Sequence, residues 1–264
     1  MMFPLLTHSR LPRRAAFAAL CAGLLLPLAA SAQDAALANW PIATPPPGAN
    51  PATFPVPRND WLQSFIGNMK RAKANPGELV FDGDSITAGW IGNNGKGVWE
   101  KNFAPYKAAD FGIGGDRTEH VLWRLQHGQL DGLHPKLVLL MIGTNNSGGN
   151  SEEQITEGVT ACVNEYRKRC PDAVILLQAI FPRSAKAEDP IRQKLKNINA
   201  NIAKLADGKK TVYMDFSDKF LEADGTLSPT IMPDFLHPNA KGYEIWADAI
   251  RPEIEKVMGP VPAK

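Results

Sequence analysis

The sequence of 264 residues is poor in cysteine and histidine and has no excess of charge of either sign. It contains three cysteines and five histidines, and 29 basic residues nearly balance 27 acidic ones. No group of Cys, His and Asp residues has the spacing of metal ligands, so we expect no metal centre. Because no basic run is present, the sequence lacks the electrostatic signature of a nucleic-acid-binding protein. We therefore expect no nucleic-acid partner.

The sequence also lacks a long uninterrupted apolar run. Residues 1–32 contain three arginines, then an apolar stretch interrupted by Pro27, then Ala30-Ser31-Ala32. The stretch is short for a membrane span, and the layout is typical of a secretory signal peptide cleaved after Ala32. A retained membrane anchor is the alternative. We expect a secreted or periplasmic protein whose mature chain has no membrane span.

Removal of that peptide changes the balance of charge and cysteine. It leaves 26 basic against 27 acidic residues, a net charge near −1, and only Cys162 and Cys170. The pattern of residues 151–170 predicts one helix, in which these two cysteines would lie roughly 12 Å apart, beyond disulfide reach. Unpaired thiols are therefore favoured, unless the helix ends before Cys170.

Residues 33–58 are rich in proline and alanine and read as a linker or a surface arm. Beyond them, short apolar runs of the kind buried on both faces of a sheet alternate with helical patterns. The runs are residues 78–83, 108–113, 136–143, 173–181 and 210–216. The alternation predicts an α/β fold with three α/β/α layers and a five-stranded, parallel, flavodoxin-like sheet in a single domain.

Signals for helix starts stand between these runs. Asp60 precedes an apolar helical stripe, Ser151 and Gln154 form a capping box, and Asp189 precedes a proline. A last helix is expected after Pro238. These positions leave the polar segments after the strands as loops.

The polar segments should meet at one edge, because the carboxyl ends of parallel strands lie together. They are Gly83-Asp84-Ser85, residues 112–120, residues 143–149 and residues 234–239. The Gly-rich segment "GIGGD" lacks the spacing of a dinucleotide fingerprint and its later acidic ligand, so no cofactor is expected.

Ser85 has two interpretations, a helix N-cap or a nucleophile. A serine nucleophile needs a base and an acid that orients the base. His237 is the candidate base, because Asp234 lies three residues before it and can accept from one ring nitrogen. A purely structural His–Asp pair is the alternative. Asp84 is adjacent to Ser85 and is expected to brace the turn.

Acyl transfer also requires hydrogen-bond donors for the oxyanion. The glycines of residues 112–115 can present a backbone N–H, and Asn145 can present a side-chain amide. Turn geometry and a loop cap would explain the same residues separately. Their joint position after the strands favours a site for acyl transfer.

These blocks resemble the SGNH (GDSL-type) hydrolases. The similarity is closer still to the catalytic subunits of platelet-activating-factor acetylhydrolase, through "DFGIGGDRTEHVLWRLQHGQL", "IGTNNSGG" and "DFLHPN". The resemblance implies that Ser85 is the nucleophile, His237 the base and Asp234 its orienting acid. It further implies an oxyanion hole formed by the N–H groups of Ser85 and Gly115 and by Asn145. Residues 59–260 would form the hydrolase domain.

Two features depart from that subfamily, namely Asp82 before the Gly-Asp-Ser turn and the signal peptide. They affect the expected substrate and leave the reaction unchanged.

We predict an exported serine esterase that hydrolyses short-chain acetyl esters of sugars or polysaccharides without a cofactor. The alternatives are a phospholipid, lysophospholipid or aryl-ester hydrolase and, outside the enzymes, a carbohydrate-binding protein. The oligomeric state stays open, and a homodimer is compatible with the sequence.

Overall fold

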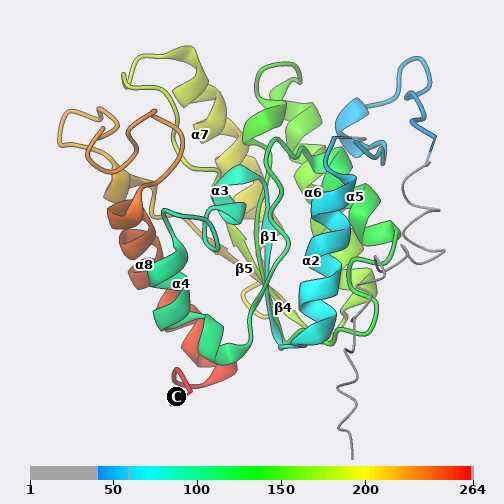
Figure 1. The fold of residues 1–264 in the computed structure, drawn as a ribbon. Helices are drawn as coiled ribbons and strands as arrows, with labels where there is room; N and C mark the ends of the chain where they lie inside the picture. Colours follow the sequence, from blue (N-terminus) through cyan, green and yellow to red (C-terminus); the bar gives the residue numbers. More distant parts are fainter. Residues whose placement is uncertain (1–40, 59, 263–264) are drawn as a thin grey trace, which may run out of the picture.

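The computed structural model describes residues 41–58 and 60–262 (Figure 1). The expected signal peptide, its cleavage site and the first part of the expected arm lie outside these residues. Within the described part of the chain, no helix has both the length and the apolar character needed to cross a membrane.

The sheet has five parallel strands in the order β2-β1-β3-β4-β5. The strands are β1 (Leu79–Gly83), β2 (Ala109–Asp110), β3 (Leu137–Met141), β4 (Val174–Gln178) and β5 (Thr211–Met214). This is the flavodoxin-like order, and the predicted fold class is confirmed. β2 is shorter than its apolar run, although the N–H groups of Phe111 and Ile113 still donate to the carbonyls of Phe81 and Gly83 in β1, at 2.9 and 3.2 Å.

Helices cover both faces of the sheet. They are α2 (Leu62–Ala74), α3 (Ser85–Ala88), α4 (Lys96–Asn102), α5 (Thr118–Gln126), α6 (Glu152–Arg169), α7 (Pro190–Ile202) and α8 (Ala240–Met258). The core on one face joins α2, α5, α6 and α7 to the sheet, and the other face carries α3, α4 and α8 (Figure 1). Neighbouring strand residues alternate between these cores, as Val80 and Phe81 do, and both are fully buried.

The sequence signals for two of the helix starts are confirmed. The Ser151 hydroxyl accepts from the N–H of Gln154 at 3.2 Å, and the Gln154 side chain accepts from the N–H of Ser151 at 3.1 Å. The Asp189 carboxylate accepts from the N–H of Ile191, with a proline at the first helical position. These bonds satisfy backbone donors that would otherwise have no partner inside the helix.

The predicted cap of the first helix is wrong. Trp61 stands at the N-cap of α2 and makes no side-chain capping bond. Asp60 instead forms a two-point ion pair with Arg58, at 3.1 and 2.6 Å. A carboxylate binds a guanidinium fork more strongly than a single backbone N–H, which explains the difference.

Residues 50–58 lie along the amino ends of α5 and α6. The Asn50 amide donates to the Gln154 carbonyl at 3.0 Å, and the Thr118 hydroxyl donates to the carbonyl of the fully buried Ala52 at 2.7 Å. The N–H of Val56 donates to the Glu119 carbonyl at 3.3 Å. This part of the predicted linker or arm therefore packs against the helices as an arm.

The two described cysteines are free. Cys162 is buried in α6 and its Sγ donates to the Thr118 carbonyl at 3.4 Å, whereas Cys170 caps the end of α6. Burial raises the pKa of both thiols, which keeps them protonated and unreactive at neutral pH.

Candidate active site

A chain of hydrogen bonds joins the three residues predicted to react. The Oγ atom of Ser85 lies 2.9 Å from Nε2 of His237, and Nδ1 of His237 lies 2.6 Å from Oδ2 of Asp234. Each imidazole nitrogen thus has one partner, a hydroxyl on one side and a carboxylate on the other. This arrangement can move a proton from the hydroxyl to the ring while the carboxylate stabilises the resulting charge.

The turn after β1 sets the position of Ser85. Of the two interpretations of Ser85, the helix cap does not hold, because Asp84 is the N-cap of α3 and accepts the N–H of Ile86 at 2.9 Å. Asp84 therefore braces the turn, as expected, and the Ser85 hydroxyl is left for His237. A side chain at Gly83 would place its Cβ 2.3 Å from the Met141 carbonyl, so the turn requires glycine there. Burial raises the pKa of Asp84 to about 6.

His237 is held by the turn that begins at Asp234. The second carboxylate oxygen of Asp234 accepts the N–H groups of Leu236 at 3.1 Å and His237 at 2.7 Å. Phe235 adopts a left-handed conformation with φ 57°, and its carbonyl accepts the Ser184 N–H at 3.0 Å. Partial burial opposes ionisation of Asp234, but the bonds from His237 outweigh it and hold the pKa of Asp234 below its ordinary value.

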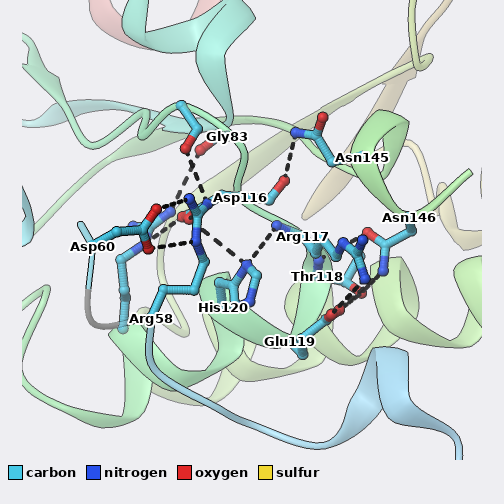
Figure 2. A network of polar contacts seen from close by, with 12 residues as sticks. Arg58, Asp60, Gly83, Asp116, Arg117, Thr118, Glu119, His120, Asn145 and Asn146 are labelled. Atoms are coloured by element: carbon cyan, nitrogen blue, oxygen red, sulfur yellow. Dashed lines mark hydrogen bonds and ion pairs between the residues drawn. The ribbon is translucent and has the colours of Figure 1, made fainter. Parts of the chain in front are cut away.

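Gly115 and Asn145 are connected through one loop. Gly114 lies against Ser85, since a Cβ built on it would be 3.9 Å from the Ser85 Cβ, and Gly115 follows with a φ of 77° that favours glycine. The Asn145 side-chain amide donates to the Asp116 carbonyl at 2.9 Å (Figure 2). One amide N–H of Asn145 is thereby fixed, and the second remains for another acceptor.

All five predicted site residues therefore lie at the carboxyl edge of the sheet. Ser85 follows β1 and Asn145 follows β3. These two strands are neighbours in the sheet although β2 separates them in sequence. β2 lies on one side of β1, and β3 and the later strands lie on the other side. In open α/β sheets, ligands bind at the carboxyl ends of the strands where the strand order reverses in this way.

A buried charge network behind this loop was not predicted from the sequence. The fully buried Arg124 donates to Asp82 and to Asp116, each at 2.9 Å, and Asp82 also accepts from Gln129 at 2.8 Å and from the Tyr166 hydroxyl. One cation thus serves two buried carboxylates. Burial raises the pKa of Asp116 to about 7, against the opposing charge of Arg124. The only signal in the sequence was an aspartate inside an otherwise apolar strand.

The candidate site is open to solvent. The side chain of His237 is 38% exposed and that of Asp234 56% exposed, and Ser85 is half-buried. A cavity of about 250 Å³ lies beside the turn and is lined by Ala88 of α3, by residues 112–114 and by part of α2. None of the five predicted site residues lines this cavity.

The same described residues provide no cluster of three or more His, Cys, Asp or Glu side chains suited to a metal ion. Two other described histidines have structural contacts. His120 packs edge-on against Trp61, and its Nδ1 accepts the Arg117 N–H at 2.9 Å. His127 stacks on Trp123. Both lie in or next to α5 and pack against aromatic side chains.

Comparison with known proteins shows the family of the chain. The sequence profile of the GDSL-like Lipase/Acylhydrolase family matches residues 81–245. Platelet-activating factor acetylhydrolase IB subunit alpha1 of Homo sapiens is 35% identical over 201 residues, which cover 74% of this chain and 85% of that protein. The alpha2 subunit of Bos taurus is 33% identical over 220 residues, or 80% and 91% of the two chains.

Solved structures show the same fold at lower identity. A GDSL-like lipase from Bacteroides thetaiotaomicron has a TM-score of 0.59 and 22% identity, with 74% of this chain and all of that chain covered. A catalytic mutant of an acetylxylan esterase from Geobacillus stearothermophilus has a TM-score of 0.56 and 21% identity, with 67% and 94% covered. The family profile spans more than half of the sequence, and both subunits match over most of their length. The chain therefore belongs to the GDSL-like lipase/acylhydrolase family and is a carboxylic-ester hydrolase.

Proposed function

We propose that the protein is an exported acetylesterase with Ser85 as nucleophile, His237 as general base and Asp234 as the acid that orients the base. The observation that carries the proposal is the hydrogen-bonded chain from Ser85 Oγ through His237 to Asp234. His120, by contrast, accepts a backbone N–H at Nδ1 and packs against Trp61.

The reaction proceeds through an acyl-enzyme. Ser85 Oγ attacks the ester carbonyl while His237 Nε2 takes the hydroxyl proton, and Asp234 stabilises the imidazolium. His237 then gives the proton to the departing alcohol. Water repeats the cycle on the acyl-serine, with His237 again as base, and releases the carboxylic acid.

The oxyanion of the tetrahedral intermediate binds to the N–H groups of Ser85 and Gly115 and to the Asn145 amide. The proposal is supported by the contact of Gly114 with Ser85 and by the bond that fixes Asn145 to Asp116. Donors held in this way before reaction are usually worth about 3–4 kcal/mol each in the transition state.

The open site favours O-acetyl groups on sugars or polysaccharides as substrates. The exposed His237 and Asp234 leave room for an alcohol moiety that extends into solvent. One structural neighbour is named an acetylxylan esterase, although at 21% identity its likeness concerns the fold. Phospholipid acetyl esters are the second candidate, favoured by the 35% identity to a platelet-activating factor acetylhydrolase subunit.

The triad is tested with p-nitrophenyl acetate. Because its members act as a unit, Ser85→Ala and His237→Ala should each lower kcat by several orders of magnitude, and the double variant should be little worse than either. Losses that multiply in the double variant would contradict a shared mechanism. If Ser85→Ala hydrolysed an acetyl ester as fast as the wild type does, the proposed function would be overturned.

The substrate class is tested by comparing acetylated xylo-oligosaccharides with acetylated ether phospholipid at equal ester concentration. We expect a higher kcat/KM on the sugars, and the opposite order would support the second candidate.

Export is tested by expressing the full chain and sequencing the amino terminus of the released protein. We expect it to begin at Gln33, after the predicted cleavage site.

A further inference from the structure

Arg58 lies over the loop that contains Gly115, although it belongs to the arm before the first helix. Its Nη1 donates to the Gly114 carbonyl at 3.0 Å and lies 3.6 Å from Oδ1 of Asp116 (Figure 2). The Asp60 carboxylate accepts from Nε and Nη2 of the same guanidinium, and the side chain of Arg58 is 24% exposed. A Cβ on Gly115 would lie 2.8 Å from Nη1, so a side chain at this position would displace the end of Arg58.

The carbonyl of Gly114 and the N–H of Gly115 belong to the same peptide group. In a planar trans peptide these two groups point in opposite directions, so a partner that fixes the oxygen also fixes the direction of the N–H. A cation at the carbonyl polarises the amide as well, and hydrogen bonds in such a chain strengthen one another. Arg58 therefore acts on the Gly115 donor from the far side of its own peptide.

The same guanidinium affects the second proposed donor through Asp116. Oδ2 of Asp116 is bound by Arg124, whereas its buried Oδ1 makes no hydrogen bond and has Arg58 as a neighbouring cation. The backbone carbonyl of Asp116 holds the Asn145 amide. The loop that connects both donors thus contacts two arginines, Arg124 through Oδ2 of Asp116 and Arg58 through the Gly114 carbonyl.

We propose that Arg58 is a positioning residue for the oxyanion hole, which it orients and polarises through the Gly114–Gly115 peptide. The inference rests on the proposed role of the Gly115 N–H. It assigns a function to the arm, because the docking of residues 50–56 on α5 and α6 brings Arg58 to this loop. Arg58 needs no contact with the substrate.

The test compares Arg58→Gln, which removes the charge, with Arg58→Lys, which keeps it. We expect Arg58→Gln to lower kcat on p-nitrophenyl acetate by about 10-fold, less than the 10²–10³-fold for loss of an oxyanion donor itself. KM should change little, because the effect belongs to the transition state. Arg58→Lys should recover part of the rate. Arg167→Gln is the matched control, since Arg167 pairs with Asp207 beside the start of β5, at the other edge of the sheet, and should leave kcat unchanged.

Two further measurements separate polarisation from simple anchoring of the arm. The Gly115 amide proton, followed by NMR in ¹⁵N-labelled protein, should shift upfield in Arg58→Gln and less in Arg58→Lys. Affinity for methylboronic acid, which forms a tetrahedral adduct on a reactive serine, should fall by the same factor as kcat/KM. A wild-type rate in Arg58→Gln would overturn the inference. The inference would also be overturned if Arg58→Gln and Arg58→Lys lost the same rate, both melted at a lower temperature, and the Gly115 resonance did not move.

The proposed function can fail separately. If the wild type does not hydrolyse the ester, or if Ser85→Ala is as active as the wild type, the esterase mechanism is wrong. The Gly115 resonance still reports on the Arg58 contact in that case, so an unmoved resonance would also overturn the inference.

Discussion

The carboxylate of Asp82 and the guanidinium of Arg124 meet 2.9 Å apart in the core, and both side chains are fully buried. Arg124 also binds Asp116, whose backbone carbonyl holds Asn145. The interior of the protein thus contains a charged connection from Asp82, next to the end of β1, to the loop of the candidate site. A buried pair of this kind is costly to break, because the partner left behind is a buried charge.

We expect Asp82→Asn to lower the free energy of unfolding by about 3 kcal/mol, the lower end of the range for a broken buried ion pair. The lower end applies because Asp116 remains as a counter-charge for Arg124. The control is Lys136→Ala, which breaks the solvent-exposed pair with Glu78 and should cost about 1 kcal/mol or less. Urea denaturation of the two variants measures both values, and equal costs would contradict the buried charge network.

Asn145→Ala should lower kcat by about 10²–10³-fold with little change in KM, because the proposed bond forms to the oxyanion rather than to the ground-state ester. The measurement is the steady-state rate on p-nitrophenyl acetate. A rise in KM with an unchanged kcat would instead identify Asn145 as a residue that binds the substrate before reaction.

Acyl length should limit the reaction sharply. The side chains of His237 and Asp234 are 38% and 56% exposed, so the open candidate site provides little enclosure for a long acyl chain. Each methylene that meets a wall instead of a pocket costs about 1 kcal/mol or more. We expect kcat/KM on p-nitrophenyl esters to be highest for acetate, lower for butyrate and near the detection limit for octanoate. A profile that rises through octanoate would favour a lipase-like enzyme.

His120 should make the protein less stable in acid. Burial, followed by the charges of Arg58, Arg117 and Arg124, lowers the pKa of His120 to about 3. The unfolded chain binds a proton at this residue below about pH 6.5 while the folded chain does not, so stability falls as pH drops from 6.5 towards 3. The contribution has a slope of at most about 1.4 kcal/mol per pH unit.

The measurement is urea denaturation at several pH values between 4 and 7 for the wild type and His120→Gln. The substituted protein should be less stable at pH 7 and should show a shallower loss of stability towards pH 4. Parallel curves would mean that His120 does not carry the difference in proton binding.

Local patterns in the sequence predicted most of the fold. Each of the five apolar runs contains one strand, and the capping residues Ser151 and Asp189 mark the starts of α6 and α7. Such signals depend on residues close together in the chain, which is why they can be read without a structure. The failure at Asp60 has a local cause as well, because a neighbouring arginine competes for the same carboxylate.

The sequence by itself determined which residues could form a site, because strand ends place their polar segments at one edge of a parallel sheet. It led to Ser85, Gly115, Asn145, Asp234 and His237, whose catalytic roles stay predictions. Only the tertiary structure decided the contacts, such as the one between Ser85 and His237 across 152 residues. It alone showed the contacts of Arg58 and Arg124, because a long charged side chain follows no periodic pattern and its partner depends on which segments fold against it.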